Sequence, residues 1–226
     1  MIDVHSHILP QIDDGSQSME ETLGMLEQLK QQGVTKVVAT PHFYAHKDNL
    51  DAFLACRAQS VAKLPQRADL PQVIVGAEVA YFSGIGQSLE MKKLQIGDTG
   101  LLLIEMPFTN WTACMVQDIC AVSDQLGLQP VLAHVNRYRG QMNRFADILL
   151  EQGVLFQCNA EALFSFFSRR WTLKQFTRGS IHFLGSDCHN LATRPPMLAD
   201  AVKIIKEELG EDVLQSIAHN QAQYFG

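Results

Sequence analysis

The sequence predicts an α/β fold built on a parallel sheet, and two observations predict it. Short runs rich in Val, Ile and Leu recur along the chain at intervals of roughly 24 to 37 residues. Segments with the three- and four-residue periodicity of amphipathic helices lie between most of these runs. Repeated strand–helix units form parallel sheets, because a crossover returns the chain to the same end of the sheet. Both a doubly wound open sheet and a closed βα barrel fit this pattern.

The predicted strands are short and contain few polar residues before their carboxyl ends. In chain order they cover residues 2–7, 36–42, 72–79, 100–106, 130–135, 154–159 and 181–186.

Two helices are predicted most clearly, over residues 18–32 and 196–209, where apolar residues recur every three or four positions. Ser18, followed by Glu21 three residues later, is typical of a capping box at a helix start. Gly33 is a suitable helix stop, because glycine readily adopts the left-handed conformation that often ends a helix. No linker or internal repeat interrupts the pattern, so we expect one domain over residues 1–226.

Composition restricts the function. The 226 residues are 46% hydrophobic and 19% charged, which is ordinary for a globular protein, and the net charge of -6 argues against nucleic-acid binding. The longest apolar run, residues 101–104, is too short to span a bilayer, and the N-terminus lacks a signal pattern. Five cysteines form no CxxC pair. We therefore expect a cytoplasmic protein with reduced thiols that is not embedded in a membrane.

Ionisable side chains fall at the carboxyl ends of six of the seven predicted strands. Parallel βα folds place their active sites at this end of the sheet. The residues are His5, His7, His42, Glu78, Glu105, His134, Asp187 and His189. One histidine or glutamate at a strand end is usually structural, but so many at equivalent positions predict a shared site.

The residue types at these ends indicate a metal centre. His5 and His7 are two apart, so on a regular strand both side chains point to one face and can hold one ion. Imidazole and carboxylate without thiolate suit Mn, Fe or Zn rather than a structural cysteine site. Eight or nine ligands exceed the capacity of one ion, which predicts two or three. Bridged metals of this kind promote phosphoryl transfer.

The motifs also resemble those of a known family. HSHILPQIDDG (5–15), ATPHF (39–43), GAEV (76–79), LIEM (103–106), LAHVNRY (132–138) and GSDCHN (185–190) are similar to PHP (polymerase and histidinol phosphatase) proteins. Within that family the chain most resembles the bacterial tyrosine phosphatases encoded with capsular and exopolysaccharide synthesis genes. The resemblance runs from Met1 to about Pro196.

The resemblance implies a distorted (β/α)7 barrel of PHP type, with three metal ions, preferably Mn, at the carboxyl-terminal rim of its strands. His5, His7, Glu78 and Asp187 would hold the first ion; Glu78, Glu105 and His134 the second; Asp14, His42 and His189 the third. Arg137 and Arg194 match the phosphate-contacting arginines, and a guanidinium suits phosphoryl oxygens. The implied reaction is hydrolysis of phosphotyrosine, with a bacterial tyrosine autokinase as the partner. An activated water would attack phosphorus without a phosphoenzyme.

Two positions depart from the family pattern. Asn136 stands where a glutamate is common, and Cys188 stands where a small or apolar residue is usual. Neither is a ligand in the pattern, so the departures bear on substrate preference.

Three other functions share some of these sequence features. Cys188 and Arg194 have the Cx5R spacing of cysteine-dependent phosphatases, although no glycine-rich phosphate loop separates them. A PHP phosphomonoesterase acting on a small metabolite such as histidinol phosphate would use the same metals. A non-catalytic PHP module typically lacks ligands that this chain has. The aromatic segment 163–171 is a packed apolar segment, a partner-docking surface or a wall for a phosphotyrosine ring.

Overall fold

The computed structural model describes residues 1–226 and contains a strand in every predicted strand segment. Two segments are each divided in two, so nine short strands replace the seven predicted. Segment 36–42 becomes β2 (Lys36–Ala39) and β3 (His42–Phe43). Segment 72–79 becomes β4 (Gln72–Val75) and β5 (Glu78–Ala80).

The breaks have local causes. Pro41 lies in the first break, and proline has no N–H to donate to a ladder. Gly76 lies in the second, where the chain passes close to Ile96; a Cβ at Gly76 would lie 2.9 Å from the Ile96 side chain.

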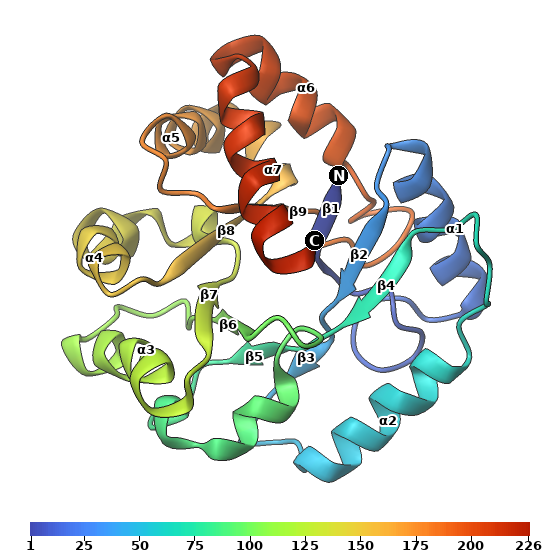
Figure 1. The fold of residues 1–226 in the computed structure, drawn as a ribbon, viewed down its shortest axis with the longest axis horizontal. Helices are drawn as coiled ribbons and strands as arrows, with labels where there is room; N and C mark the ends of the chain where they lie inside the picture. Colours follow the sequence, from blue (N-terminus) through green and yellow to red (C-terminus); the bar gives the residue numbers. More distant parts are fainter.

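The remaining strands are continuous: β1 (Ile2–Ser6), β6 (Leu101–Glu105), β7 (Gln129–Leu132), β8 (Leu155–Asn159) and β9 (Phe183–Gly185). All pairings are parallel, in the orders β1-β2-β4 and β3-β5-β6-β7-β8-β9. Backbone bonds from Gly76 N to Ala39 O (2.9 Å) and from Glu78 N to Pro41 O (3.0 Å) continue across the breaks. The sheet is therefore parallel and curled, with its strands at the centre of Figure 1.

The segment after β9 returns to β1. Asp187 N donates to His5 O at 2.8 Å, and His7 N donates to Cys188 O at 2.9 Å. These two bonds place the first and last strands of the curled sheet side by side.

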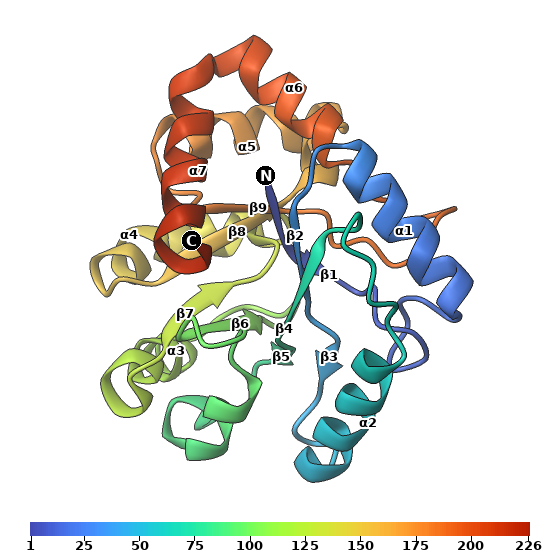
Figure 2. The same cartoon turned by 45° about the vertical axis from the view of Figure 1, so that its right-hand side comes forward.

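Seven α-helices lie outside the sheet (Figures 1 and 2). They are α1 (Met19–Gln31), α2 (Leu50–Ala62), α3 (Ala113–Leu126), α4 (Arg139–Glu151), α5 (Phe166–Thr177), α6 (Leu198–Leu209) and α7 (Glu211–Phe225). Short 3-10 helices are η1 (Ile85–Gln87), η2 (Leu89–Leu94), η3 (Val135–Tyr138) and η4 (Ala160–Leu163). None of the helices combines the length and the apolar character needed to cross a membrane.

The start of α1 forms half of the predicted capping box. The Ser18 side chain accepts from Glu21 N at 3.1 Å, as predicted. The Glu21 carboxylate, however, accepts from Gln17 N at 2.8 Å rather than from Ser18 N. Gly33 follows α1 with φ 79°, which confirms the helix stop.

The inside of the curl is apolar toward the amino ends of the strands. Val4, Val38, Leu103 and Phe183 belong to one buried cluster there, and Phe225 from α7 joins it. The end of α7 thus packs against the amino-terminal side of the sheet, which α7 crosses in Figure 1.

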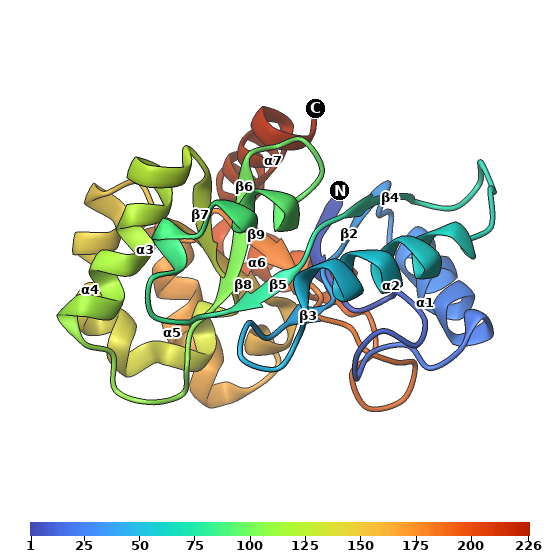
Figure 3. The same ribbon diagram turned by 90° about the horizontal axis from the view of Figure 1, so that it is seen from below.

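Figure 3 shows the two rims of the sheet from the side. The loops that follow β1, β3 and β9 lie together at the lower edge, whereas both chain termini lie at the upper edge. The predicted ligands belong to the lower rim.

Candidate metal centre

The structure brings all nine predicted ligand residues to the carboxyl ends of the strands. Three groups have ligand atoms within 4.8 Å of one another: His5, His7 and Asp187; His42, Glu78 and Glu105; and His7, Asp14, His42 and His189. His134 joins them through Glu78, as described below. The groups overlap, so the cluster is one continuous set of ligand atoms.

Four side chains surround the innermost point. His5 Nε2 and His7 Nε2 are 3.3 Å apart, and each lies 3.3 Å from Glu78 Oε2. Asp187 Oδ1 lies 3.6 Å from His5 Nε2 and 3.4 Å from His7 Nε2. All four side chains are buried.

A second set continues from Glu78 toward β6 and β7. His134 Nε2 lies 2.8 Å from Glu78 Oε1 and 3.5 Å from Glu105 Oε1. His42 Nδ1 lies 3.0 Å from Glu78 Oε2, so His42 reaches this set as well.

The outermost set reaches solvent. Asp14 Oδ1 lies 3.5 Å from both His42 Nε2 and His189 Nε2, and the Asp14 side chain is 65% exposed. Solvent and substrate can therefore approach the cluster from the Asp14 side.

A β-bulge in β1 sets the direction of His5, and of His7 just beyond the strand. Asp3 pairs with Val37 and Ser6 with Ala39, so β1 has one more residue than β2 between these points. Such a bulge reverses the alternation of side chains within a strand. Val4 can thus join the apolar interior while His5 and His7 also face inward.

Two other ligands sit on left-handed backbone just beyond a strand. His134 has φ 32° after β7, and Asp187 has φ 52° after β9. This conformation is uncommon for residues other than glycine and concentrates at functional sites. It turns both side chains away from the regular strand direction and toward the cluster.

Sequence reasoning missed three polar residues that hold the ligands. Asp13 Oδ2 lies 2.6 Å from His7 Nδ1. Gln157 Oε1 lies 3.2 Å from His5 Nδ1 and accepts from His134 N at 2.7 Å. Asn159 Nδ2 donates to Asp187 Oδ2 at 2.7 Å. The signal for the last two was in the sequence, since glutamine and asparagine at alternate positions of a buried strand need partners.

The electrostatics favour ionised carboxylates. Burial alone would lower the pKa of His5, but Glu78 and Asp187 raise it overall. Burial would raise the pKa of Glu78 and Asp187, yet the neighbouring imidazoles, His5 foremost, hold both well below their usual range. Burial and the charge of His7 lower the pKa of His189 to about 4. Ionised carboxylates and neutral imidazoles are the forms that bind metals, so Glu78, Asp187 and His189 are in their binding form, whereas His5 must lose a proton to bind a cation.

The unpaired polar atoms of the protein concentrate here. Five buried side-chain atoms have no hydrogen-bond partner, and four of them belong to His42 (Nδ1), Glu78 (Oε2), His134 (Nδ1) and His189 (Nε2). His42 Nδ1 and Glu78 Oε2 are close, but not in hydrogen-bond geometry. Unpaired buried polar atoms destabilise a fold. With a donor set of imidazole and carboxylate, these residues fit divalent cations.

The two predicted phosphate-binding arginines flank the cluster. Arg137 Nη2 and Arg194 Nη2 donate to Asp187 Oδ2 at 2.8 Å and 2.7 Å. Arg137 also pairs with Glu161 at 3.0 Å. Asp187 thus presents one oxygen to the imidazoles and the other to the guanidinium groups. Both arginines keep part of their surface in solvent, so an anion can reach them.

The two departures from the family pattern have structural roles. Asn136 Oδ1 accepts from Asn159 N at 3.0 Å and so supports β8. Cys188 is fully buried, and burial raises the pKa of its thiol. A buried neutral thiol is a poor nucleophile, which argues against the Cx5R mechanism.

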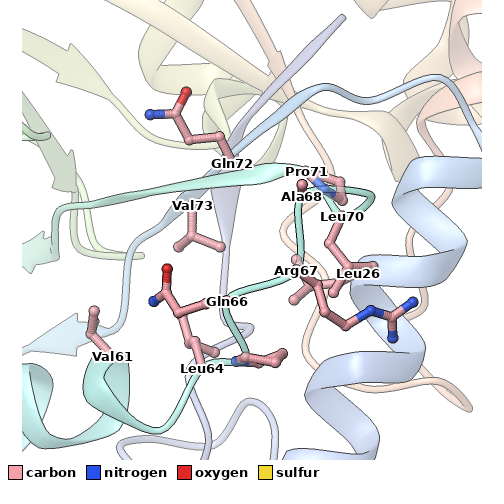
Figure 4. A pocket seen from close by; sticks show the side chains of 11 residues that line it. Leu26, Val61, Leu64, Gln66, Arg67, Ala68, Leu70, Pro71, Gln72 and Val73 are labelled. Atoms are coloured by element: carbon pink, nitrogen blue, oxygen red, sulfur yellow. The ribbon is translucent and has the colours of Figure 1, made fainter.

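A hollow of ≈ 530 Å³ lies away from this rim (Figure 4). It is lined by Leu26 of α1, by the α2–β4 connection including Leu64 and Arg67, and by Val73 of β4. None of the candidate ligands borders it. We therefore assign metal binding to the polar rim and not to this hollow.

The aromatic segment 163–171 is partly buried and partly exposed. Leu163 is buried in the core, as a packed segment requires, whereas Phe166 and Phe167 are exposed.

Comparisons with known proteins identify the family. A family described as "Capsular polysaccharide synthesis, CpsB/CapC" matches residues 1–225. The tyrosine-protein phosphatase CpsB of Streptococcus agalactiae is 31% identical, over 99% of this chain and 97% of that protein. The tyrosine-protein phosphatase YwqE of Bacillus subtilis is 28% identical, over 97% and 89%.

Solved structures extend the comparison. A crystal structure from a study of YwqE of B. subtilis and CpsB of Streptococcus pneumoniae, described as metal-dependent tyrosine phosphatases, has a TM-score of 0.87. It is 27% identical and covers 99% of this chain and 94% of that one. A β-aspartyl dipeptidase from Fervidobacterium islandicum shares only the fold, with a TM-score of 0.55 at 11% identity. The resemblance predicted from the motifs is confirmed, and the chain belongs to the CpsB/CapC family.

Proposed function

We propose that this chain is a metal-dependent protein-tyrosine phosphatase. One observation carries the proposal: nine metal-competent side chains and two arginines from separate strand ends converge on one rim. We further propose that the curled sheet is a distorted (β/α)7 barrel of PHP type, forming a single domain over residues 1–226. The relatives named as tyrosine-protein phosphatases support the choice of substrate.

The cluster would hold three divalent cations, with Mn the first candidate and Fe or Zn the alternatives. The inner set is His5, His7, Glu78 and Asp187; the second is Glu78, Glu105 and His134; the outer is Asp14, His42 and His189. Such ions, when bound, would supply Lewis acidity that activates water and neutralises phosphoryl charge.

The protein's own groups would orient the substrate. Arg137 and Arg194 would bind the phosphoryl oxygens, where fixed donors stabilise the charge that develops in the transition state. Asp187 would keep both guanidinium groups at the edge of the cluster. The phenol of tyrosine has a pKa of about 10, so its departure as phenolate needs less proton transfer than that of an alkoxide.

The partner would be a phosphotyrosine protein, in keeping with the family's place in capsular polysaccharide synthesis. We propose the tyrosine-rich tail of a bacterial autokinase. The cytoplasmic location stays a prediction from the sequence.

The test is a metal-replete activity panel. Activity should be highest on a phosphotyrosine peptide, lower on a phosphoserine peptide and on histidinol phosphate, abolished by EDTA and restored by Mn. Cys188→Ser should keep most of the activity, whereas Glu78→Ala should lose several orders of magnitude. Full activity after exhaustive chelation, with metal loss verified by elemental analysis, would refute the metal mechanism. Faster turnover of histidinol phosphate would refute the substrate class.

A further inference from the structure

A hollow of ≈ 290 Å³ lies beside Arg137 on the same rim. It is bordered by residues of the β6–α3 loop and of the η3–α4 junction: Phe108, Thr109, Arg137, Tyr138, Arg139, Gly140 and Gln141. Its lining includes two arginines and no acidic residue, although Arg137 Nη2 also pairs with Asp187 and Glu161. The hollow therefore suits an anionic group, and it shares Arg137 with the metal cluster.

Aromatic rings connect this hollow to the cluster. The Phe108 ring lies 5.3 Å from the Tyr138 ring, and the Tyr138 ring lies 5.7 Å from that of His134. Phe108 also follows Glu105 by three residues. Tyr138 thus links Phe108 to the candidate ligand His134 through two ring contacts.

Phe108 is 70% exposed, although its loop is held in place. Trp111 Nε1 donates to Pro107 O at 3.1 Å, and Trp111 N donates to Gln141 Oε1 at 3.2 Å. Gln141 in turn donates to Asn110 Oδ1 at 3.0 Å. A large apolar side chain held in solvent by a fixed loop is a feature of binding surfaces, because preorganisation lowers the entropic cost of binding.

Arg139 is the second arginine that borders the hollow. Its Nη1 donates to Phe167 O at 2.7 Å, which ties the side chain to the start of α5. A planar guanidinium can stack on an aromatic face and also attract negative charge.

We propose that Phe108 is the specificity-determining residue that receives the ring of phosphotyrosine, while Arg137 receives its phosphate. This inference rests on the proposed function. It names the side chain by which the enzyme would distinguish aryl from alkyl phosphates. An alkyl phosphate such as phosphoserine has no ring to contact Phe108, so the interaction is available to phosphotyrosine alone.

The exposed phenylalanines of α5 are the rival surface. Phe166 is 86% exposed, and its ring meets that of Phe167 edge-on at 5.8 Å. Neither side chain borders the hollow beside Arg137. Phe166 is therefore a matched comparison: the same residue type, also exposed, in the segment that follows β8.

The experiment measures kcat/KM of the Mn-loaded protein on p-nitrophenyl phosphate, a phosphotyrosine peptide, a phosphoserine peptide and glycerol phosphate. Phe108→Ala should lose about 3- to 10-fold on the two aryl substrates, the range expected for one aromatic contact. Its rates on the two alkyl substrates should stay within about 2-fold of the parent by the same reasoning. Phe108→Tyr should retain the aryl preference, and Phe166→Ala should match the parent throughout.

Equal losses on aryl and alkyl substrates, or an unchanged ratio in Phe108→Ala, would overturn the assignment of Phe108. So would an aryl-selective loss in Phe166→Ala alone. Because Phe108 is exposed, its truncation should leave the unfolding midpoint and metal content unchanged, and both are measured alongside. A parent protein that fails to hydrolyse phosphotyrosine would instead refute the proposed function, and this inference with it.

Discussion

Asp13 and His7 form a short, buried pair at the base of the first loop. Asp13 Oδ2 lies 2.6 Å from His7 Nδ1, and the same oxygen accepts from His42 N at 3.0 Å. The carboxylate leaves His7 Nε2 facing Glu78 and Asp187. It therefore fixes the orientation of one candidate ligand while anchoring the backbone of another.

Asp13→Asn should weaken metal binding about 10- to 100-fold, because carboxylates that orient ligating histidines typically contribute that much. The measurement is a competition titration of Mn or Zn against a chromophoric chelator. Asp124→Asn, at an exposed aspartate of α3, is the control. Equal metal affinity in parent and Asp13→Asn would show that the pair has no bearing on the centre.

Arg194→Lys should reduce kcat/KM nearly as much as Arg194→Ala. A lysine supplies a point charge in place of the planar fork that matches phosphoryl oxygens. The expected cost is about 2–4 kcal/mol of transition-state stabilisation, by analogy with loss of one oxyanion donor. Steady-state kinetics on the phosphotyrosine peptide decides the question. Near-parental rates in both variants would leave Arg137 as the phosphate ligand.

Gly185→Ala should destabilise the protein by about 1–3 kcal/mol, the usual cost of overpacking a core. A Cβ at Gly185 would lie 2.8 Å from His5 Cβ and 2.8 Å from Gln157 Nε2. Gly140→Ala is the matched control, since nothing lies within 4 Å of a Cβ at that helical position. The control should be neutral or more stable by about 0.4–1 kcal/mol. Urea unfolding gives both values, and equal midpoints would contradict the packing argument.

His182→Asn should flatten the dependence of stability on pH. Burial lowers the pKa of His182 to about 4, and its Nδ1 accepts from Phe156 N at 3.0 Å. The folded-state pKa lies below the unfolded value of about 6.5. The stabilisation is therefore full above about pH 6.5 and is lost as pH falls toward 4.

Asparagine keeps an acceptor near the position of Nδ1 and does not titrate. Between pH 7 and pH 5 the parent should lose about 1–2 kcal/mol more than the variant. Denaturant unfolding at both pH values measures this difference. Parallel losses in the two proteins would mean that His182 is not the titrating group.

The strand–helix order and the gathering of the candidate ligands at one rim could be predicted from the sequence, because hydrophobic periodicity and strand ends are local features. The bulge in β1 could not, since it depends on pairing Asp3 and Ser6 with β2. The breaks at Pro41 and Gly76 were likewise hidden within runs that looked continuous. Gln157 and Asn159 indicate a need for partners, but the sequence does not show that these partners are His5 and Asp187 on other elements. Long-range hydrogen bonds leave little trace in one sequence.

The apolar interior beneath the cluster restricts the side from which ions and phosphate can reach it. Val4 and Phe183 fill the curl below His5, and Phe225 packs against the far end. This side of the cluster is apolar, whereas Asp14, Arg137 and Arg194 keep part of their surface in solvent, so ions and phosphate reach the centre from the exposed rim. Product phosphate held between Arg137 and Arg194 would therefore stand in the exit path of the ions. Phosphate release and metal exchange would then use the same opening of the rim. Bound phosphate would slow the loss of metal to a chelator.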